Sequence, residues 1–215
     1  RTERGGDGME CIIDPNNDNV VYASVYFGNI ARSMNNGVSF GGFANSNVIN
    51  EQGAWVTPYI LDRNNSDIMF IGYKNVWRTT NALASPPTFT PISASLAGSN
   101  SSNMRQLRQA KIDGNRLVAI RSDNKFFRSD NALGAAPTWV YLTSNLPGGR
   151  TLRDVETSAF DNNELWIIRN NIVYKSTNGG TSWTNINSNL PGINKNCLVA
   201  DPLSNEGIYI GTDAG

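Results

Sequence analysis

The fold of this chain is decided at residues 176–183, which read Ser176-Thr177-Asn178-Gly179-Gly180-Thr181-Ser182-Trp183. In this pattern a hydroxyl residue is followed by asparagine, glycine, a second hydroxyl residue and an aromatic residue. A short asparagine side chain bonds the backbone amides of a tight turn, and glycine supplies a positive φ. The segment therefore predicts a turn between two short strands, with the aromatic ring packed beneath it.

The same pattern occurs three more times. Residues 33–40 repeat it with phenylalanine in place of tryptophan, and residues 79–89 and 129–139 carry it with three extra residues before the second hydroxyl. A shared insertion in two copies strengthens the assignment of a repeat. The residues predicted to form the four turns are Ser33, Asn35, Gly37, Phe40, Thr79, Asn81, Thr88, Phe89, Ser129, Asn131, Thr138, Trp139, Ser176, Asn178, Gly180 and Trp183.

Short β-rich stretches surround each turn. The first stretch of each unit is predicted to end in aspartate, and the second is apolar. The third ends in a basic and a hydroxyl residue, preceded by an aromatic residue in three of the four units, and the fourth follows the turn. A four-stranded unit repeated every 40 to 51 residues has the size of one β-propeller blade. The aspartates that mark the units are Asp14, Asp62, Asp113, Asp161 and Asp201.

We therefore predict an all-β fold, a partial β-propeller of four-stranded antiparallel blades over residues 1–215. The blades span approximately 9–50, 56–98, 105–147 and 153–191, and residues 196–215 supply the first strands of a fifth. The first and last segments do not complement each other within one blade. We expect the rest of the same polypeptide to complete a larger propeller of seven or eight blades, or a tandem pair of propellers.

The repeated turns resemble the Asp-box, or BNR, superfamily, which includes sialidases, sortilin-type receptor domains and family 74 xyloglucanases. The resemblance covers nearly the whole chain. Residues 5–15 and 188–192 are most similar to large secreted surface proteins of bacteria. The resemblance implies a secreted or cell-surface protein in which the boxes lie at the blade rim, whereas ligands bind over the axial channel.

Charge and composition exclude several function classes. The chain has 18 basic and 18 acidic residues, so no net charge attracts nucleic acid or an anionic membrane. No apolar run is long enough to span a bilayer. The absence of histidine excludes His-dependent triads and most zinc sites. Cys11 and Cys197 lie in apolar strands, and we expect two buried free thiols without a disulfide.

No cofactor is predicted. The Asn- and Asp-rich segment 14–19 has oxygen ligands of the kind that calcium prefers, but its spacing does not match an EF-hand loop. We favour a turn in which the Asp14 side chain bonds the backbone.

Candidate ligand-binding residues lie on the segments that lead into the first strand of each blade. They are Trp55, Tyr59, Arg105, Arg108, Arg150 and Arg153. Arginines suit carboxylate ligands, and the faces of Trp55 and Tyr59 suit pyranose rings, although packing between blades is the competing role for Tyr59.

Two enzyme classes use residues of these types. A sialidase needs an arginine cluster and a tyrosine–glutamate pair, for which Tyr59 and Glu156 are of the right types, but the Arg-Ile-Pro motif of that family is absent. Residues 22–28 are similar to the xyloglucanase strand that carries a catalytic aspartate, which aligns with Tyr26. A tyrosine cannot replace that carboxylate.

We therefore predict no catalytic residue in this chain. The leading hypothesis is an extracellular or cell-surface binding or scaffold module that engages a protein or glycan. A glycoside hydrolase with catalytic residues partly outside this chain and a structural segment of a surface assembly remain as alternatives.

Overall fold

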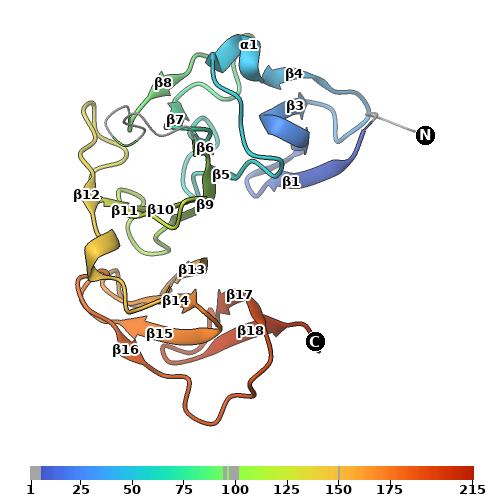
Figure 1. Cartoon of the computed structure of the whole chain (residues 1–215). Coiled ribbons are helices and arrows are strands. Elements are labelled where there is room, and N and C mark those ends of the chain that lie inside the picture. The colour runs from blue at the N-terminus through green and yellow to red at the C-terminus, as the bar shows by residue number, and fades with distance from the viewer. Residues whose placement is uncertain (1–5, 94–95, 97–101, 150) are drawn as a thin grey trace. The chain divides into compact units, whose positions relative to one another are not determined.

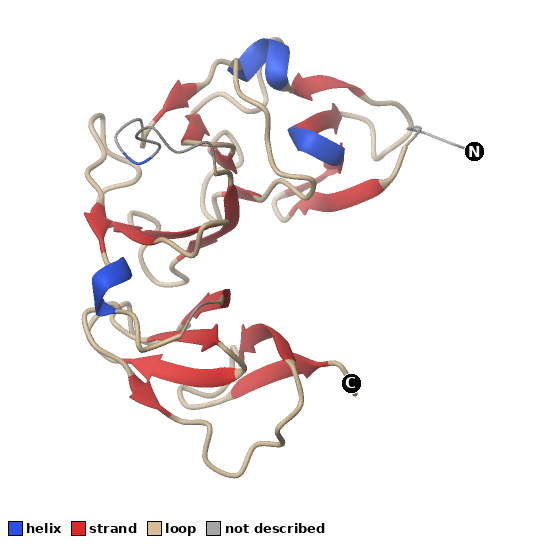
Figure 2. Ribbon diagram, in the orientation of Figure 1, coloured by secondary structure: helices blue, strands red, loops and turns tan. Residues whose placement is uncertain are grey.

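A computed structural model describes residues 6–93, 96, 102–149 and 151–215. Strands and turns make up almost all of it (Figures 1 and 2). The helical segments with described bounds are η1 (Tyr26–Gly28), α1 (Ser46–Ile49) and η2 (Thr143–Asn145). No helix in the described part of the chain is long and apolar enough to cross a membrane.

The chain divides into two compact units, residues 1–107 and 108–215. The first unit holds the sheets β1-β2-β3-β4 and β5-β6-β7-β8, in which neighbours in sequence are neighbours in the sheet. Their strands are β1 (Gly8–Asp14), β2 (Asn17–Val25), β3 (Asn29–Ser33), β4 (Gly41–Ala44), β5 (Tyr59–Leu61), β6 (Met69–Gly72), β7 (Val76–Thr79) and β8 (Thr90–Pro91).

The boundary between the units falls inside β9 (Met104–Gln109), which belongs to the sheet β12-β11-β10-β9. The second unit continues with the sheet β13-β14-β15-β16, drawn in orange in Figure 1, and the two-stranded sheet β17-β18. The strands are β10 (Leu117–Arg121), β11 (Phe126–Ser129), β12 (Val140–Tyr141), β13 (Leu152–Thr157), β14 (Leu165–Arg169), β15 (Ile172–Ser176), β16 (Thr184–Asn185), β17 (Lys195–Ala200) and β18 (Ile208–Thr212). Every pairing with a described register is antiparallel.

Each core lies between the faces of successive sheets, because alternate residues of a strand point to opposite faces. In the first unit, Val20 and Tyr22 of β2 belong to the same buried cluster as Tyr59 of β5. In the second unit, Trp166 of β14 packs in a cluster with Leu198 of β17. The described residues thus form four four-stranded sheets and the first two strands of a fifth, as predicted for propeller blades.

One register is common to all four complete sheets. We call the turns at 33–40, 79–89, 129–139 and 176–183 the box turns, and the first residue of each the box hydroxyl. The basic residue before the box hydroxyl lies opposite an apolar or aromatic residue of the second strand. The box hydroxyl itself lies opposite the second-strand residue that precedes this one in sequence. The basic pairs are Tyr22↔Arg32, Phe70↔Arg78, Val118↔Arg128 and Trp166↔Lys175. The basic–hydroxyl pair at the end of each third strand therefore marks the register, with an aromatic residue before it in three sheets and Ala31 in the first.

The same basic residue also ties successive sheets together. Arg32 donates to the carbonyl oxygens of Ala82 and, at 2.8 Å, Ala84, and Arg128 donates to the carbonyl oxygen of Gly179. Ala82 and Gly179 stand at the same position of their boxes, three residues after the hydroxyl. Charge-assisted hydrogen bonds of this kind are stronger than neutral ones, so the turns at 79–89 and 176–183 are also docking points for the preceding sheet.

The two compact box turns, at 33–40 and 176–183, share one hydrogen-bond pattern. The Oδ1 atom of Asn178 accepts from the amide of Ser182 at 2.9 Å and from the Ser176 hydroxyl at 3.0 Å, while the Ser176 oxygen accepts from the amide of Gly180 at 2.9 Å. The box at 33–40 shows the same three bonds. In the expanded copies the asparagine reaches further along the chain, to the amides of Thr88 and Thr138, each at 2.8 Å.

Replacing Asn178 with alanine should therefore lower the free energy of unfolding by about 1–2 kcal/mol, because the amide of Ser182 and the Ser176 hydroxyl lose their acceptor. Urea unfolding followed by tryptophan fluorescence measures the change. Asn178→Asp keeps the accepting oxygen and is the matched control. Equal losses in the two variants would show that the side-chain oxygen does not stabilise the turn.

The structure corrects the predicted ends of two first strands. The residue that closes each first hairpin through a backbone bond is Asp62, Ala110, Ser158 or Asp201. Asp113 and Asp161 lie three residues later, inside the turns, where they accept from the amides of Asn115 and Asn163. Asp14, Asp62, Ala110 and Ser158 therefore hold equivalent positions in the first four units, each 48 residues after the one before.

The expectation of buried thiols was wrong. Cys11 and Cys197 are both free, as expected, but both are exposed. Cys11 shares a strand face with the exposed Ile13, whereas Ile12 packs into the core. Cys197 likewise alternates with the buried Leu198. A one-residue shift in a strand moves a side chain to the other face.

Candidate functional site

The two ends of each sheet carry different segments. In a sheet whose neighbouring strands are antiparallel and consecutive, the strand 2–strand 3 turn and the connection to the next sheet leave from one end. We call this the connection end. The box turns lie at the opposite end, which we call the box end.

An exposed aromatic cluster occupies the connection end of the first sheet. Tyr26 and Phe27 come from the β2–β3 turn and Trp55 from the β4–β5 connection, and the three residues are 38% to 51% exposed. The rings of Tyr26 and Trp55 stack with centroids 5.3 Å apart and planes 18° apart. Phe27 meets Trp55 edge-on, with centroids 5.2 Å apart. We call these three residues the aromatic platform.

Backbone bonds hold the platform in place. The amide of Phe27 donates to the carbonyl oxygen of Trp55 at 3.3 Å, and the amide of Gly53 donates to that of Phe27 at 3.4 Å. The Glu51 carboxylate accepts from the backbone and side-chain amides of Asn75, at 2.9 and 2.7 Å. The loop that carries Trp55 is thereby fixed to two turns of its unit, so the rings lose little conformational freedom on binding a ligand.

The platform also contains a strained residue. Phe27 has φ 61° and ψ 28°, a left-handed conformation that is uncommon for a bulky side chain. Gly28 follows with φ 74°, and its carbonyl oxygen accepts from the Tyr73 hydroxyl at 2.6 Å. A Cβ atom on Gly28 would lie 2.6 Å from the Tyr73 ring. Strained backbone costs about 1–3 kcal/mol and clusters at functional sites, which supports a binding role for this turn.

The predicted binding residues of the first unit separate. Trp55 lies in the platform, but Tyr59 is 3% exposed and its hydroxyl donates to the Glu10 carbonyl oxygen at 2.6 Å. Tyr59 therefore packs in the core and offers no face to a ligand. Arg105 is partly buried in β9.

The sequence analysis does not include two of the three platform residues among its candidate binding residues. It predicts Tyr26 only as the substitute for a catalytic aspartate, and it makes no prediction for Phe27. The available signal was an aromatic pair before a glycine at the end of an otherwise buried strand.

The predicted arginines of the second unit make contacts within the protein. Arg153 in β13 donates to the Asn196 side chain at 3.4 Å. Arg108 lies 3.5 Å from an Asp154 oxygen and 3.6 Å from a Glu156 oxygen. Arg150 lies outside the described residues.

Asp154 and Glu156 form a carboxylate pair on β13, but both are engaged. Asp154 is fully buried and accepts from the amides of Val155 and Leu198, at 2.9 and 2.7 Å. Glu156 accepts from the amide of Thr157 and also pairs with Lys111 at 3.4 Å. Burial raises the pKa of Asp154, an effect that Arg108 partly offsets. These contacts join β9, β13 and β17 and describe a structural tie rather than a free acid and base.

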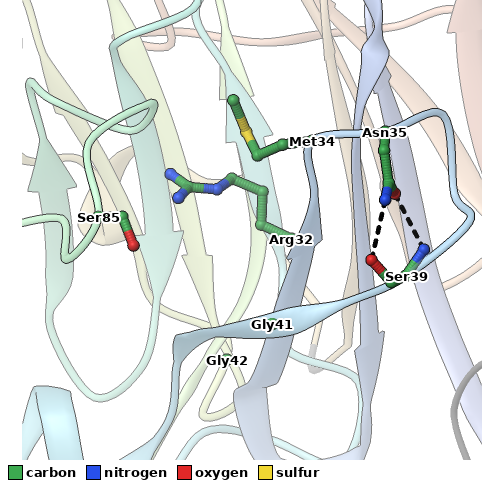
Figure 3. Close-up of a pocket in the computed structure, with 7 residues that line it drawn as sticks. All are labelled: Arg32, Met34, Asn35, Ser39, Gly41, Gly42 and Ser85. Carbon is green, nitrogen blue, oxygen red and sulfur yellow. Dashed lines mark hydrogen bonds between the residues drawn. The ribbon is translucent and has the colours of Figure 1, made fainter.

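A shallow pocket of about 230 Å³ lies at the box end of the first unit (Figure 3). The Arg32 guanidinium points across it toward Ser85, and Asn35 and Ser39 bond each other. The bonds of Arg32 to Ala82 and Ala84 and its position 5.5 Å from the Phe43 ring already occupy this cation. The pocket therefore belongs to the contact between two sheets.

No metal site is apparent across the described residues, which contain no group of three or more His, Cys, Asp or Glu side chains placed to hold an ion. In the segment considered for calcium, the Oδ1 atom of Asp14 accepts from the amide of Asn16 at 2.9 Å. That bond makes the turn predicted for this segment.

Comparison with known proteins supports the fold. No protein-family model and no curated protein matches the chain. Among solved structures, an ancestral GH74 enzyme has a TM-score of 0.73 and 20% identity over 99% of this chain and 28% of its own. The WD40 β-propeller domain of Doa1 has a TM-score of 0.63 and 10% identity, covering 99% and 65%. YCF48 bound to D1 peptide has a TM-score of 0.56 and 14% identity, covering 99% and 64%.

These identities establish the fold alone. The described sheets are blades of a β-propeller, which confirms the predicted fold class. The chain spans between about a quarter and two thirds of the three proteins that it resembles.

Proposed function

We propose that this chain is part of an Asp-box β-propeller that acts as a non-catalytic binding module, and that its aromatic platform binds a glycan. The single observation that carries the proposal is the half-exposed, backbone-anchored stack of Tyr26 and Trp55. Exposed apolar patches often mark a binding site. Rings that loop bonds already hold in place also lose little conformational entropy when a ligand binds.

A glycan suits this surface better than a charged ligand. The platform consists of one tyrosine, one phenylalanine and one tryptophan ring, and none of the three residues is an Asp, Glu, Lys or Arg that could pair with a charged ligand. The axial C–H groups of a β-linked pyranose form an apolar face of matching size, and Tyr and Trp also offer polar edges to its hydroxyls. An apolar peptide segment is the alternative occupant that the experiment below distinguishes.

Further features of the proposal come from the repeat itself. In all four box turns the asparagine Oδ1 atom accepts from the amide of the second hydroxyl residue, which supports membership of the Asp-box superfamily and through it a secreted or cell-surface location in a bacterium. We also propose that the remainder of the polypeptide completes a propeller of seven or eight blades. In keeping with this, the chain covers 28% of the GH74 enzyme.

Glycoside hydrolysis is the competing function. The likeness to GH74 enzymes keeps it open, but it rests on the fold alone. In this chain Tyr26 stands where the family resemblance places a carboxylate. The carboxylates of Asp154 and Glu156 are paired with Arg108 and Lys111. Neither arrangement provides the accessible acid and base that hydrolysis requires.

Replacing Trp55 with alanine should weaken binding of cellohexaose or a xyloglucan oligosaccharide about tenfold, because one stacked ring contributes about 1.4 kcal/mol. Isothermal titration calorimetry on the whole chain measures the dissociation constant. The bond from Phe27 uses the backbone of residue 55, so the loop should keep its fold.

Tyr141→Ala is the matched control, since Tyr141 is as exposed as Trp55 but lies in the second unit. Equal affinity in wild type and Trp55→Ala would remove the platform from the binding site. Binding of apolar peptides but of neither oligosaccharide would replace the glycan by a peptide ligand.

A further inference from the structure

The turns that join the first two strands of the last three sheets expose an apolar residue at one shared position. Each turn is closed by a bond from a backbone amide to the carbonyl oxygen six residues later, from Ala110 to Arg116, from Ser158 to Glu164 and from Asp201 to Gly207. The residue two places after the amide is apolar in all three turns and is 51%, 49% and 91% exposed. We call these residues, Ile112, Phe160 and Leu203, the apolar turn residues.

The turn itself does not require an apolar side chain at this position. The corresponding turn of the second sheet closes in the same way, from Asp62 to Ile68, and carries an exposed asparagine there, Asn64. Polar residues are the usual choice in such turns. Ile112 and Phe160 belong to four-stranded sheets that another sheet follows, so their exposure is a property of the turns.

Side-chain bonds fix the three turns to one another. Arg116, in the turn of the third sheet, donates to the side-chain oxygen of Asn163 in the turn of the fourth sheet at 3.2 Å. The Lys175 ammonium lies 2.5 Å from a Glu164 oxygen and 3.1 Å from a Glu206 oxygen, and so joins the turns of the fourth and fifth sheets. Single exposed apolar residues are ordinary, but three at one position of linked turns indicate an interaction surface.

The charges beside this surface are acidic. The cations of these turns, Lys111 and Arg116, are already paired with carboxylates. Asp113 and Asp161 directly follow two of the apolar turn residues, and neither forms an ion pair in the described part of the chain. Asp161 is exposed and Asp113 is half-buried. An apolar surface with acidic flanks complements a partner that is apolar with basic flanks.

We propose that the apolar turn residues are a docking surface for a protein partner that presents an amphipathic helix. The apolar stripe of that helix covers the three side chains, and its Lys or Arg residues lie beside Asp113 and Asp161. A helix suits this surface better than an extended strand, because each hairpin already closes its own backbone and a helix binds through side chains. The surface lies in the second unit, so the inference does not depend on the aromatic platform.

The probe is a synthetic peptide of about 18 residues, long enough to form a helix, in which leucine recurs at the helical period and lysine fills the other positions. Fluorescence anisotropy should show that it binds the whole chain at least about tenfold more tightly than two control peptides. One control has the same composition in scrambled order, and the other has glutamate in place of lysine. Hydrogen exchange should show protection of residues 110–116 and 158–164 on binding.

Phe160→Asn should weaken binding of the leucine–lysine peptide about tenfold, because it removes the largest ring of the surface. Asparagine is the residue that the second sheet carries at this position, so the turn should keep its fold, which circular dichroism checks. Val38→Asn is the matched control, since Val38 is 50% exposed but lies in the first unit.

Asp161→Asn tests the charge separately. It keeps an oxygen that accepts from the amide of Asn163 but removes the negative charge, so it should weaken peptide binding about twofold to threefold. Binding of the oligosaccharides should be unchanged in both variants.

Four results would overturn the inference: no binding of the leucine–lysine peptide, equal binding of either control peptide, protection outside the two turns, or full binding by Phe160→Asn. Sedimentation equilibrium of the chain alone tests a second copy as the occupant. A dimer that Phe160→Asn abolishes would overturn the assigned partner.

Discussion

Replacing Trp166 with alanine is expected to lower the free energy of unfolding by about 3–5 kcal/mol, whereas Tyr209→Ala should change it by no more than about 0.5 kcal/mol. Both aromatic residues belong to the second strand of their sheets, and both project from the face turned away from the preceding sheet. Trp166 is 2% exposed and packs with Leu198 and Ala200 of the following sheet. Tyr209 has no such cover in the described structure.

Chemical unfolding of the two variants measures this difference, and a probe in each unit tests whether the transition is shared. The expected asymmetry depends on the sheet contact and not on the residue type. A large loss of unfolding free energy in Tyr209→Ala would show that the Tyr209 ring is buried, contrary to its exposure in the structure.

Replacing Asp154 with alanine is expected to lower the free energy of unfolding by about 3 kcal/mol. Removing one partner of a buried ion pair leaves the other charge uncompensated, and the amide of Leu198 also loses its acceptor. Arg108 is partly exposed, which places the expected loss at the lower end for such pairs. Asp154→Asn keeps an accepting oxygen and should cost less.

The pH dependence of the Asp154→Asn comparison gives a second readout. Burial raises the pKa of Asp154 in the folded state, so between the unfolded and folded pKa values the native protein binds more protons than the unfolded chain. Stability from this group therefore falls as pH rises through that window. The advantage of wild type over Asp154→Asn should narrow over the same range.

Asp213→Ala is the control for this series, because Asp213 is exposed and its carboxylate accepts from the exposed Asn194 and Asn196 side chains. Its unfolding midpoint should match that of wild type. If the unfolding midpoint of Asp154→Ala also matches that of wild type, the contacts of Asp154 with Arg108 and Leu198 do not stabilise the unit.

Local pattern was sufficient to predict the blades because the turn chemistry repeats. The box asparagines have the predicted neighbours, and the basic–hydroxyl pair of the third strand holds the same register against the second strand in every complete sheet. The ends of the first strands were less accurate. Asp113 and Asp161 bond turn amides, as Asp14 does, and the composition of a turn does not show where its strand stops.

The aromatic platform could not be predicted from the sequence, because it forms through contacts between separate segments of the chain. Tyr26 and Trp55 lie on separate segments, and their stacking follows from how the β4–β5 connection folds back over the β2–β3 turn. The burial of the two cysteines was predicted wrongly because the inward and outward faces of a strand differ by one residue in register. Tyr59 packs in the core, which is the competing role named for it from the sequence. The arginines are of a type that suits ligands, but Arg108 instead pairs with Asp154 and Glu156.

The most direct test of a non-catalytic binding role is a single incubation of the whole chain with a xyloglucan oligosaccharide, in which bound ligand and new reducing ends are measured together. The expected result is saturable binding that weakens about tenfold in Trp55→Ala, with no reducing ends formed over time. Reducing ends that accumulate with wild type and are lost in Glu156→Gln would contradict the account, because the tie would then hold a working carboxylate.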